Sequence, residues 1–410
     1  MRTKSSWLIV AVVALPAMAG CDKKSNDTHG ATTTTASTAA GGTIKLGQTM
    51  PFSGPASAYG VIGRTHAAYF KMVNEEKGGV NGRKIELVSL DDGYNPAKTV
   101  EQTRKLVESE NILADFGSVG TAPAGAVHAY LKEKRVPQIF VSTGGEKWAD
   151  PKFPWTIGWQ PSYRAEAKMY GKYIDETKPG AKVCMLYQND DFGKDLLAGL
   201  KEAFGNDYDK KMVKTVSYEV TDPTVDSQIT SLQASGCDAV ILGATPKFAA
   251  QAIRKVFDLG WKPLEILANV SVSITSVLKP AGLDKSTGIV TGAYLKDPSD
   301  PKLASDPGLA DYRAFMKKYM PESDVNDANS VYAFGQGITM VKVLGQCGAD
   351  VTRENIMKQA LALNDVPAQV TLPGIDITTG PAALSLIAKM QLARFNGTSF
   401  ELFGKVLSSE

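Results

Sequence analysis

Short apolar segments alternate with longer amphipathic segments along most of the chain, from residue 43 to residue 290. Residues 43–49 are apolar enough for a buried strand, and residues 61–76 carry apolar side chains at helical spacing. Pro51 and Gly54 lie between these two segments and force a loop. Because this unit of strand, loop and helix recurs, the sequence predicts an α/β fold with doubly wound parallel sheets rather than a β-sandwich.

The alternation predicts two similar α/β halves followed by a hairpin. Strands are predicted at 43–49, 84–92, 112–119, 137–143, 183–188, 212–219, 239–244, 265–270 and 289–294, and helices at 61–76, 95–108, 121–134, 163–178, 225–234, 248–259, 309–319, 331–344 and 353–363, with one more from residue 192. Residues 146–161 interrupt the rhythm with three Trp and three Pro, so a boundary is expected near their end. Residues 387–407 alternate apolar and polar side chains around Asn396-Gly397, a strong hairpin signal.

The first twenty residues are predicted to be an export signal that lies outside the fold. A basic start precedes apolar residues 7–15 and a small-residue stretch that ends at Cys21. The sequence Met18-Ala19-Gly20-Cys21 resembles the bacterial lipobox, with Met18 where Leu is usual. Cys21 is therefore expected to carry a lipid anchor. An ordinary secretion signal with a chance cysteine is the alternative. Residues 21–42 are polar and low in complexity, which predicts a flexible tether.

Composition narrows the possible partners. Lys and Arg number 45 against 43 Asp and Glu, and this balance gives no reason to expect nucleic acid. After the export signal, no window is long and apolar enough for an integral membrane domain. Of the remaining cysteines, Cys184 and Cys237 lie at two predicted strands, so a disulfide and two buried free thiols both stay open. No cysteine spacing indicates a metal site.

Motifs for catalysis were not found. The chain has three histidines, and neither H-E-x-x-H nor G-x-S-x-G occurs. Asp91 and Asp92 are adjacent on a strand and point to opposite faces, so they are interpreted as loop caps rather than a paired acid and base. The sequence therefore predicts no enzyme, no cofactor and no metal, and an exported hydrolase is disfavoured.

Loops at the carboxyl ends of the predicted strands are the candidate binding elements. Ser53, Ser57 and Tyr59 follow the first strand. Gly120-Thr121 and Gly144-Gly145 follow the third and fourth strands and offer backbone N–H groups that suit a carboxylate. Tight turns also use small residues, which is the alternative explanation.

With both halves in view, residues 43–410 resemble the leucine/isoleucine/valine-binding family of ABC-importer solute receptors, the type I periplasmic binding proteins. The residues that carry the resemblance are Ser53-Gly54-Pro55, Tyr59-Gly60, Asn74, Gly78-Gly79-Val80-Asn81-Gly82, Asp91-Asp92, Asn95-Pro96, Ser142, Asp191-Phe192-Gly193 and Gly260.

The resemblance implies two lobes that are joined by three crossovers and close on a ligand. The N-terminal lobe would comprise residues 43–160 and 292–378, and the C-terminal lobe residues 161–291 and 379–410. The receptor would be periplasmic, monomeric and lipid-anchored, and would deliver its ligand to an ABC permease in the inner membrane. A sensory receptor that acts on a signalling partner is the alternative function.

By the same resemblance, the ligand-binding residues would be Tyr59, Gly120, Thr121, Gly144, Gly145, Gln160, Phe192, Thr245 and Asn269. Thr121 and Gly144 would hold a ligand carboxylate, whereas Tyr59 and Phe192 would cover its apolar part from opposite lobes. Thr245 would contribute from the second lobe.

Departures from the family pattern bear on the ligand. Gln160 and Asn269 stand where amino-acid receptors of this family place acidic residues against the ligand ammonium. A buried ammonium without a carboxylate partner is costly, so we expect a small aromatic or branched aliphatic carboxylate, with an amino acid as the alternative. Trp155 and Trp159 are candidate stacking surfaces for the ligand. If the alignment with the family is shifted, either Glu146 or Asp190 would supply the carboxylate that faces the ligand ammonium.

Overall fold

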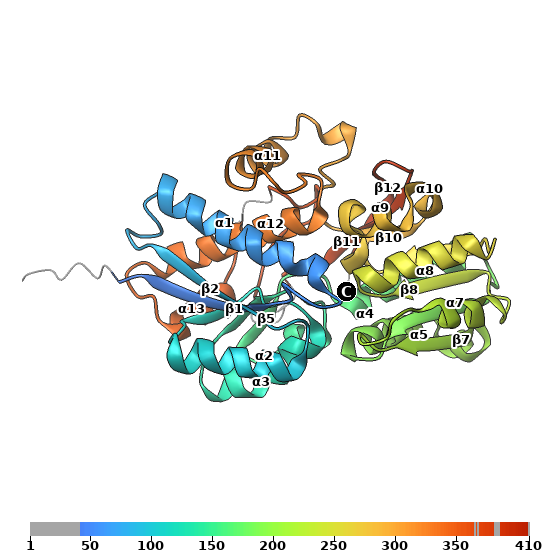
Figure 1. Ribbon diagram of the computed structural model, residues 1–410, viewed down its shortest axis with the longest axis horizontal. Coiled ribbons are helices and arrows are strands. Elements are labelled where there is room, and N and C mark those ends of the chain that lie inside the picture. The colour runs from blue at the N-terminus through green and yellow to red at the C-terminus, as the bar shows by residue number, and fades with distance from the viewer. Residues whose placement is uncertain (1–41, 365, 367–368, 381–385, 409–410) are drawn as a thin grey trace, which may run out of the picture. The chain divides into compact units, whose positions relative to one another are not determined.

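In the computed structural model, which describes residues 42–364, 366, 369–380 and 386–408, two β-sheets organise the chain and helices cover both faces of each sheet (Figure 1). This arrangement confirms the predicted α/β class with two doubly wound parallel-sheet lobes. The expectations for the export signal, for Cys21 and for the tether as far as residue 41 lie outside the described residues. No helix among the described residues is long and apolar enough to span a bilayer.

The first lobe is built on a five-stranded parallel sheet with the order β2-β1-β3-β4-β5. In its register, Leu46 of β1 lies opposite Leu87 of β2 on one side and Ala114 of β3 on the other. The elements of this lobe are β1 (Ile44–Met50), β2 (Ile85–Asp91), β3 (Ala114–Phe116), β4 (Gln138–Val141), β5 (Thr156–Gly158), α1 (Gly60–Glu76), α2 (Pro96–Arg104), α3 (Thr121–Glu133), α11 (Pro307–Tyr319), α12 (Ala328–Cys347) and α13 (Arg353–Ala360). Three short helices accompany them, η1 (Ser57–Tyr59), η2 (Lys105–Ser109) and η3 (Glu146–Ala149).

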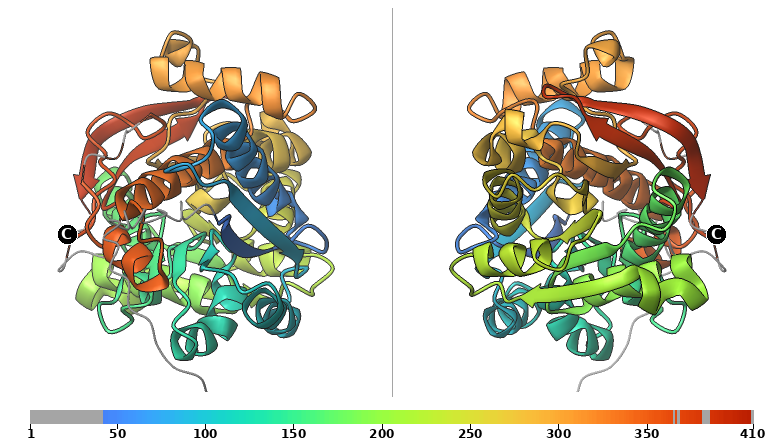
Figure 2. Two further views of the ribbon diagram at one scale, coloured as in Figure 1. Left: turned by 90° about the vertical axis from the view of Figure 1, so that its left-hand side faces the viewer. Right: turned by 90° about the vertical axis from the view of Figure 1, so that its right-hand side faces the viewer.

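Helices close both faces of the first sheet. α1 and α12 cover one face, and α2 and α3 cover the other (Figures 1 and 2). Leu46 and Phe70 share one apolar core, whereas Leu106 and Val127 belong to a separate core on the opposite face. Because α12 comes late in the chain, the first lobe is completed by residues that follow strands β6 to β10 of the second lobe in sequence.

The second lobe has a seven-stranded sheet with the order β12-β11-β10-β9-β8-β6-β7. Its strands β6 to β10 pair in parallel, and the β11–β12 hairpin (red in Figure 2) adds an antiparallel edge. The elements are β6 (Val183–Gln188), β7 (Met212–Tyr218), β8 (Ala239–Gly243), β9 (Leu264–Leu267), β10 (Val290–Ala293), β11 (Lys389–Phe395), β12 (Phe400–Ser408), α4 (Tyr163–Thr177), α5 (Asp191–Phe204), α6 (Tyr208–Lys211), α7 (Asp226–Gln233), α8 (Pro246–Asp258), α9 (Lys279–Ala281) and α10 (Leu283–Ser286). Short helices occur at η4 (Gly205–Asp207), η5 (Asn269–Ser271), η6 (Ile274–Leu278) and η7 (Pro301–Leu303).

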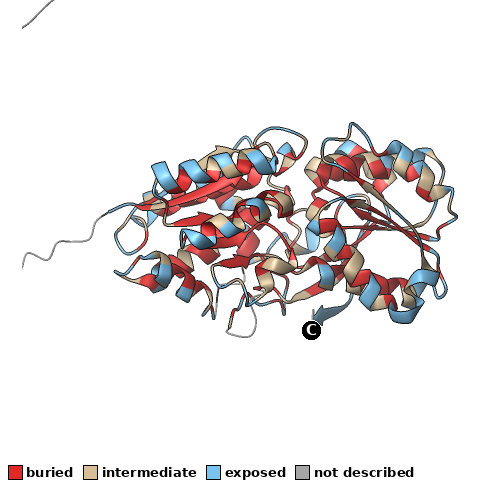
Figure 3. Ribbon diagram, turned by 90° about the horizontal axis from the view of Figure 1, so that it is seen from below, coloured by how far each residue is buried: buried red, intermediate tan, exposed pale blue. Residues whose placement is uncertain are grey.

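Successive residues of β6 show why the central strands of this sheet are apolar throughout. Cys184 and Leu186 pack in one core with α7 and α8, whereas Val183 and Met185 pack in another with α4 and α5. Side chains alternate between the faces of a strand, so a sheet covered on both faces needs continuous apolar strands. Figure 3 shows these strands as buried, with exposed residues on the outer sides of the helices.

The chain passes between the two sheets three times: between β5 and α4, after β10, and before β11. The second passage is marked by a bridge between Leu295 and Thr371 and by the packing of α11 and α12 on α1. Gly292 and Ala293, which the sequence assigned to the first lobe, lie in β10 of the second sheet.

Two local features differ from the sequence predictions. β5 joins the first sheet within residues 146–161, where no strand was predicted because Trp and Pro hid a segment of only three residues, Thr156–Gly158. The hairpin turn uses four residues rather than the Asn396-Gly397 pair alone, since β11 ends at Phe395 and β12 begins at Phe400. The Asn396 side-chain oxygen accepts hydrogen bonds from the amides of Thr398 and Ser399, which stabilises the longer loop.

Cys184 and Cys237 form a disulfide in the second lobe. Their Cα atoms are 5.9 Å apart, because Cys184 lies on β6 and Cys237 lies two residues before the neighbouring strand β8. Cys347, on α12, is a buried free cysteine. The pairing that the sequence left open is therefore a disulfide between adjacent strands.

The disulfide should contribute measurably to stability, because it joins residues separated by 53 positions. Closing a loop of that length restricts the unfolded chain, and the expected loss in the Cys184→Ser/Cys237→Ser variant is about 2–4 kcal/mol of unfolding free energy. Urea unfolding of the oxidised protein, with and without a reductant, measures this difference. Equal midpoints for oxidised wild type and the variant would contradict it, and the variant itself should not respond to the reductant.

Candidate functional site

A cavity lies between the two lobes, at the carboxyl ends of the parallel strands. It has about 1220 Å³ of empty space, part of which is open to solvent, and residues of both lobes line it. Strand-end loops of two facing sheets meet here, which is where ligands bind in open α/β folds. Among the described residues, no group of three or more His, Cys, Asp or Glu side chains is arranged to hold a metal ion.

Seven of the nine candidate residues line this cavity, and they come from six different connections of the chain. These residues are Tyr59, Gly120, Thr121, Gln160, Phe192, Thr245 and Asn269. Tyr59 and Phe192 are both nearly fully buried and approach from opposite lobes. Gly120 has a φ of 107° and forms the N-cap of α3, and an added Cβ atom would lie 2.5 Å from the Tyr94 ring. Only glycine fits this position without strain.

Gly144 and Gly145 lie outside the main cavity, in contrast to the role expected for them. They border a smaller cavity, of about 210 Å³, that shares Gln160 with the main one. A Cβ atom at Gly144 would lie 2.4 Å from the Pro161 carbonyl oxygen, and one at Gly145 would lie 2.8 Å from the Trp148 ring. Close packing therefore explains both glycines, and the Gly145 amide already donates to the Thr143 hydroxyl.

The proposed stacking surfaces and alternative anions also lie outside the main cavity. Trp159 is fully buried and its ring N–H donates to Thr339 of α12 at 2.9 Å, and Trp155 does not line the cavity. Glu146 accepts a hydrogen bond from Ser162, and Asp190 caps α5. Neither carboxylate faces the main cavity, so neither replaces the missing acidic residues there.

Four tyrosines that the sequence analysis did not select contribute most of the aromatic lining: Tyr94, Tyr163, Tyr294 and Tyr332. All four are buried. Tyr94 lies at the carboxyl end of β2 and Tyr294 follows β10, so the strand-end rule applied to every strand would have found these two. Tyr332 lies inside the long helix α12, and no local signal distinguishes it from a core residue.

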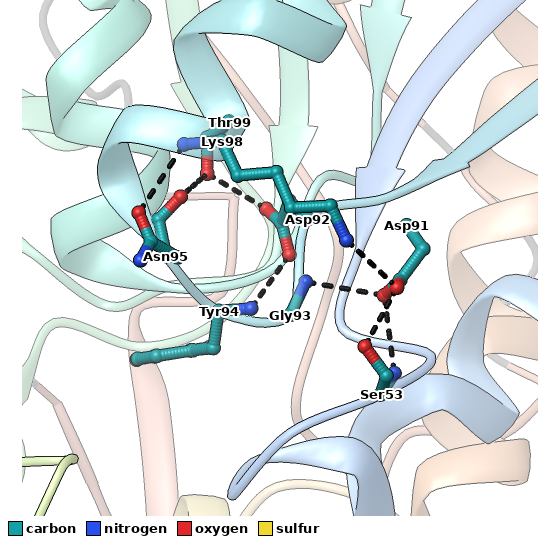
Figure 4. A network of polar contacts seen from close by, with 8 residues as sticks. All are labelled: Ser53, Asp91, Asp92, Gly93, Tyr94, Asn95, Lys98 and Thr99. Carbon is teal, nitrogen blue, oxygen red and sulfur yellow. Dashed lines mark hydrogen bonds and ion pairs between the residues drawn. The ribbon is translucent and has the colours of Figure 1, made fainter.

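The adjacent acids Asp91 and Asp92 hold the loops that carry two of the cavity tyrosines (Figure 4). Asp91 accepts hydrogen bonds from the amide and the hydroxyl of Ser53, in the loop that leads to Tyr59. Asp92 accepts one from the amide of Tyr94, whose φ is 61°. A positive φ is strained for tyrosine, so this cap compensates part of the strain. The interpretation of the acids as loop caps agrees with these contacts, and Ser53 does not line the cavity.

A buried polar network fixes the cavity side of α12. The Gln336 amide nitrogen contacts the hydroxyl oxygens of Ser142 at 3.1 Å and Tyr332 at 3.2 Å, and its oxygen lies 2.9 Å from His66 Nε2. Burial lowers the pKa of His66 to about 3, so the ring is neutral. Tyr332 in turn donates to the Gln160 oxygen at 3.4 Å. Since buried polar groups need partners, this network holds Ser142, Tyr332 and Gln160 in one arrangement.

Most hydroxyl protons along the cavity wall are already donated within the protein. Tyr59 donates to the Val270 carbonyl oxygen at 3.1 Å, Ser142 to that of Gly117 at 3.0 Å, and Thr291 to that of Leu267 at 2.8 Å. Among the remaining donors are the side-chain nitrogens of Gln160 and Asn329 and the Tyr294 hydroxyl, which have no partner among the described residues. The Thr121 amide, in the first turn of α3, is also free, whereas the Gly120 amide donates to the Ser142 carbonyl oxygen at 3.2 Å. The cavity thus offers donors to a ligand acceptor.

Charged side chains line the cavity only in the loop after β10, as far as the structure describes the chain, and all three have partners in the protein. Lys296 pairs with Asp306 at 2.9 Å. Asp297 accepts from the Phe400 amide at 3.0 Å, and Asp300 caps η7. No carboxylate is therefore free to meet a ligand ammonium at the Gly120-Thr121 end of the cavity.

Glu166 lies directly behind the cavity wall. One of its oxygens accepts from the Tyr170 hydroxyl at 2.6 Å and from the Asn269 amide at 2.7 Å, which holds the Asn269 loop in place. Burial raises the pKa of Glu166 to about 7, although both hydrogen bonds lower it. The side chain is 2% exposed and does not line the cavity, so its role is to support the wall.

Direct contacts join the two lobes around the cavity. The Tyr59 hydroxyl of the first lobe reaches the Val270 carbonyl of the second, and Ser273 of the second lobe donates to Asp327, the N-cap of α12, at 3.0 Å. These contacts require the lobes to be close together. The structure therefore represents a closed arrangement of the cavity.

Known proteins with similar sequences bind solutes. The model of the periplasmic binding protein family matches residues 43–399. Leu/Ile/Val-binding protein homolog 7 of Brucella abortus (strain 2308) is 26% identical over 348 residues, which cover 81% of this chain and 84% of that protein.

Solved structures of similar fold come from transport systems. A branched chain amino acid ABC transporter from Thermus thermophilus with bound valine has a TM-score of 0.80 at 18% identity, over 89% of this chain and 96% of that one. The fatty acid ABC transporter substrate-binding protein from Thermomonospora curvata has a TM-score of 0.73 at 22% identity, over 90% of this chain and 93% of that one. At these identities the likeness establishes the fold.

The raised pKa of Glu166 predicts a pH-dependent contribution to stability. The folded protein holds this proton up to a pH of about 7, whereas the unfolded chain releases it near 4.5, so the contribution is full below pH 4.5 and is lost as the pH rises through 7. Glu166→Gln keeps the acceptor oxygen and removes the titration. Relative to wild type, the variant should gain up to about 3 kcal/mol of unfolding free energy between pH 4.5 and pH 8.

Urea unfolding at a series of pH values measures this gain. Glu322→Gln, at an exposed position, is the control and should follow the wild-type profile. A constant difference between Glu166→Gln and wild type across the whole range would show that Glu166 does not titrate there.

Proposed function

The chain belongs to the periplasmic binding protein family, and we propose that it is the solute receptor of an ABC importer that traps a small carboxylate between its two lobes. Proteins of this family bind small molecules outside the cytoplasm and work with ABC permeases. The carboxylate would be aromatic or branched aliphatic and would lack an α-ammonium group.

The observation that carries this proposal is that the cavity has unpaired hydrogen-bond donors, whereas the carboxylates that line it are already paired within the protein. Donors remain at Gln160, at Tyr294, at the Asn329 side-chain nitrogen and at the start of α3, where the helix dipole also favours negative charge. The acids beside the cavity have protein partners, and Gln160 and Asn269 are uncharged amides. A carboxylate would satisfy the donors, whereas an ammonium would be buried without an anion, which costs several kcal/mol.

The ligands named for two of the compared structures support this chemical class. One holds valine and the other is named for fatty acids, and both ligands carry a carboxylate on an apolar body. In this chain, Tyr59 and Phe192 would cover the apolar body from opposite lobes. The Thr121 amide would hold the carboxylate, without the contribution that was first expected from Gly144, and the Gly120 amide donates instead to the Ser142 carbonyl oxygen at 3.2 Å.

Closure of the lobes would couple binding to recognition by the permease. A ligand that touches both lobes binds the closed form more tightly, and this difference in affinity shifts the population toward closure. The hydrogen bonds from Tyr59 to Val270 and from Ser273 to Asp327 would form at the same time. The receptor would act as a monomer, held at the membrane by a lipid on Cys21 and by the tether of residues 21–42.

Isothermal titration with leucine and with isocaproate, which is leucine without its amino group, tests the ligand class directly. Isocaproate or benzoate should bind, and leucine should bind at least about a hundredfold more weakly, because its ammonium would be desolvated without an anion. Tight leucine binding without binding of either acid would refute the proposal.

Gln160→Glu is the matched variant for this titration. The substitution keeps the oxygen that accepts from Tyr332 and places a negative charge beside the ligand. It should weaken the binding of isocaproate and strengthen that of leucine.

Lipid anchoring is tested by the Cys21→Ser variant expressed in a bacterial host. Without the acyl chains, most of the protein should move from the membrane fraction to the soluble extracytoplasmic fraction, since only the lipid would hold it at the bilayer. Fractionation and incorporation of a labelled fatty acid measure this shift. Equal membrane retention of variant and wild type would show that Cys21 is not the anchor.

A further inference from the structure

We propose that the cavity has an apolar arm, beyond the carboxylate-binding end, that accommodates the hydrocarbon chain of a medium-chain monocarboxylic acid. This inference rests on the proposed function, because the carboxylate would be held at Gly120-Thr121. It adds a second subsite and narrows the ligand from any small carboxylate to one with an extended apolar tail.

The arm is formed where the loop after β10 passes between two other segments. Its apolar lining residues are Ile274, Leu295, Leu303, Leu372, Phe400 and Leu402. On one side, Leu295 bridges Thr371, and the Leu372 amide donates to the Tyr294 carbonyl oxygen at 2.9 Å. On the other side, the Phe400 amide donates to Asp297 at 3.0 Å. These bonds fix the walls of the arm, so it belongs to the closed structure.

Tyr294 connects the arm to the carboxylate-binding end. Its side chain lines the same cavity as Gly120 and Thr121, and the next residue in the chain is Leu295 of the arm. A ligand with a carboxylate at Thr121 can therefore continue past the Tyr294 ring into the arm without leaving the cavity.

The charged groups of the arm are directed to protein partners, which leaves apolar atoms for the ligand. Lys296 is engaged by Asp306 and by the Gln369 carbonyl oxygen, each at 2.9 Å. Asp297 accepts from Ser299 and Phe400, and Asp300 accepts from Lys302. A second charged group on the ligand would find no free ionic partner here, whereas a hydrocarbon chain needs none.

Size and exposure favour a long chain over a compact side chain. A ligand as small as leucine, held by its carboxylate at Thr121, has too few apolar atoms to cover both the tyrosine-lined end of the cavity and the six apolar residues of the arm. Leu402, on the edge strand β12, lines the cavity and is 39% exposed. The arm thus opens toward solvent beside β12, which allows chains of different lengths.

A chain-length series of acids tests the arm. Titration of wild type with butyrate, hexanoate, octanoate and decanoate should show affinity that rises with length, by at most about fourfold per methylene group, the transfer free energy of one CH₂. Leu402→Asp places a charge in the arm and should abolish this rise while butyrate binding is retained. Leu407→Asp is the matched control, because Leu407 lies on the same strand, is 38% exposed and does not line the cavity.

The outcomes separate the arm from the proposed function. A rise with chain length that Leu402→Asp removes and Leu407→Asp preserves would support the arm. Binding of short acids with an affinity that is flat or falls with length would overturn the arm and leave the carboxylate receptor intact. Equal effects of the two Asp variants would also overturn the arm. Binding of no acid of any length would overturn the carboxylate proposal, and the arm with it.

Discussion

The pairing of buried polar groups in the closed cavity is the constraint on which the binding site depends. Each polar group buried between the lobes must find a partner in the protein or in the ligand, because an unpaired buried group is costly. Tyr59, Ser142 and Thr291 meet this requirement within the protein. The donors left over, at Gln160, Tyr294, Asn329 and the start of α3, define what a ligand must supply.

The fold brings this constraint about by placing strand ends opposite each other. Two parallel sheets face one cavity with their carboxyl ends, and the loops there are held by capping acids such as Asp92 and by the Gln336 network on α12. Because α12 follows strands β6 to β10 of the second lobe in sequence, the first lobe and the cavity wall are completed only when the chain has returned to the first lobe. The helix α12 therefore contributes both to the core of the first lobe and to the wall of the cavity.

Sequence pattern predicted the lobes well because alternating strands and helices leave a strong periodic signal. It missed β5, since a strand of three residues among Trp and Pro gives no periodicity. The family consists of solute-binding proteins, so the prediction that the chain is not an enzyme is confirmed.

For the site, strand ends indicated the loops of Tyr59 and Thr121, but they could not show that Gly144 is required by packing against Pro161. Nor could they reveal Tyr332, whose position on the cavity depends on how α12 packs in three dimensions. Strand-end position therefore identifies the segments that reach the cavity, whereas the direction of each side chain is decided by tertiary packing.

The most direct test of a carboxylate trapped between the lobes is the electron density of the ligand that accompanies the protein when it is purified from its native host and crystallised without ligand removal. We predict a carboxylate whose oxygens lie within about 3 Å of the backbone amides at the start of α3, with its apolar body between Tyr59 and Phe192. An ammonium group at that end, or a ligand that contacts only one lobe, would contradict the proposed mode of binding.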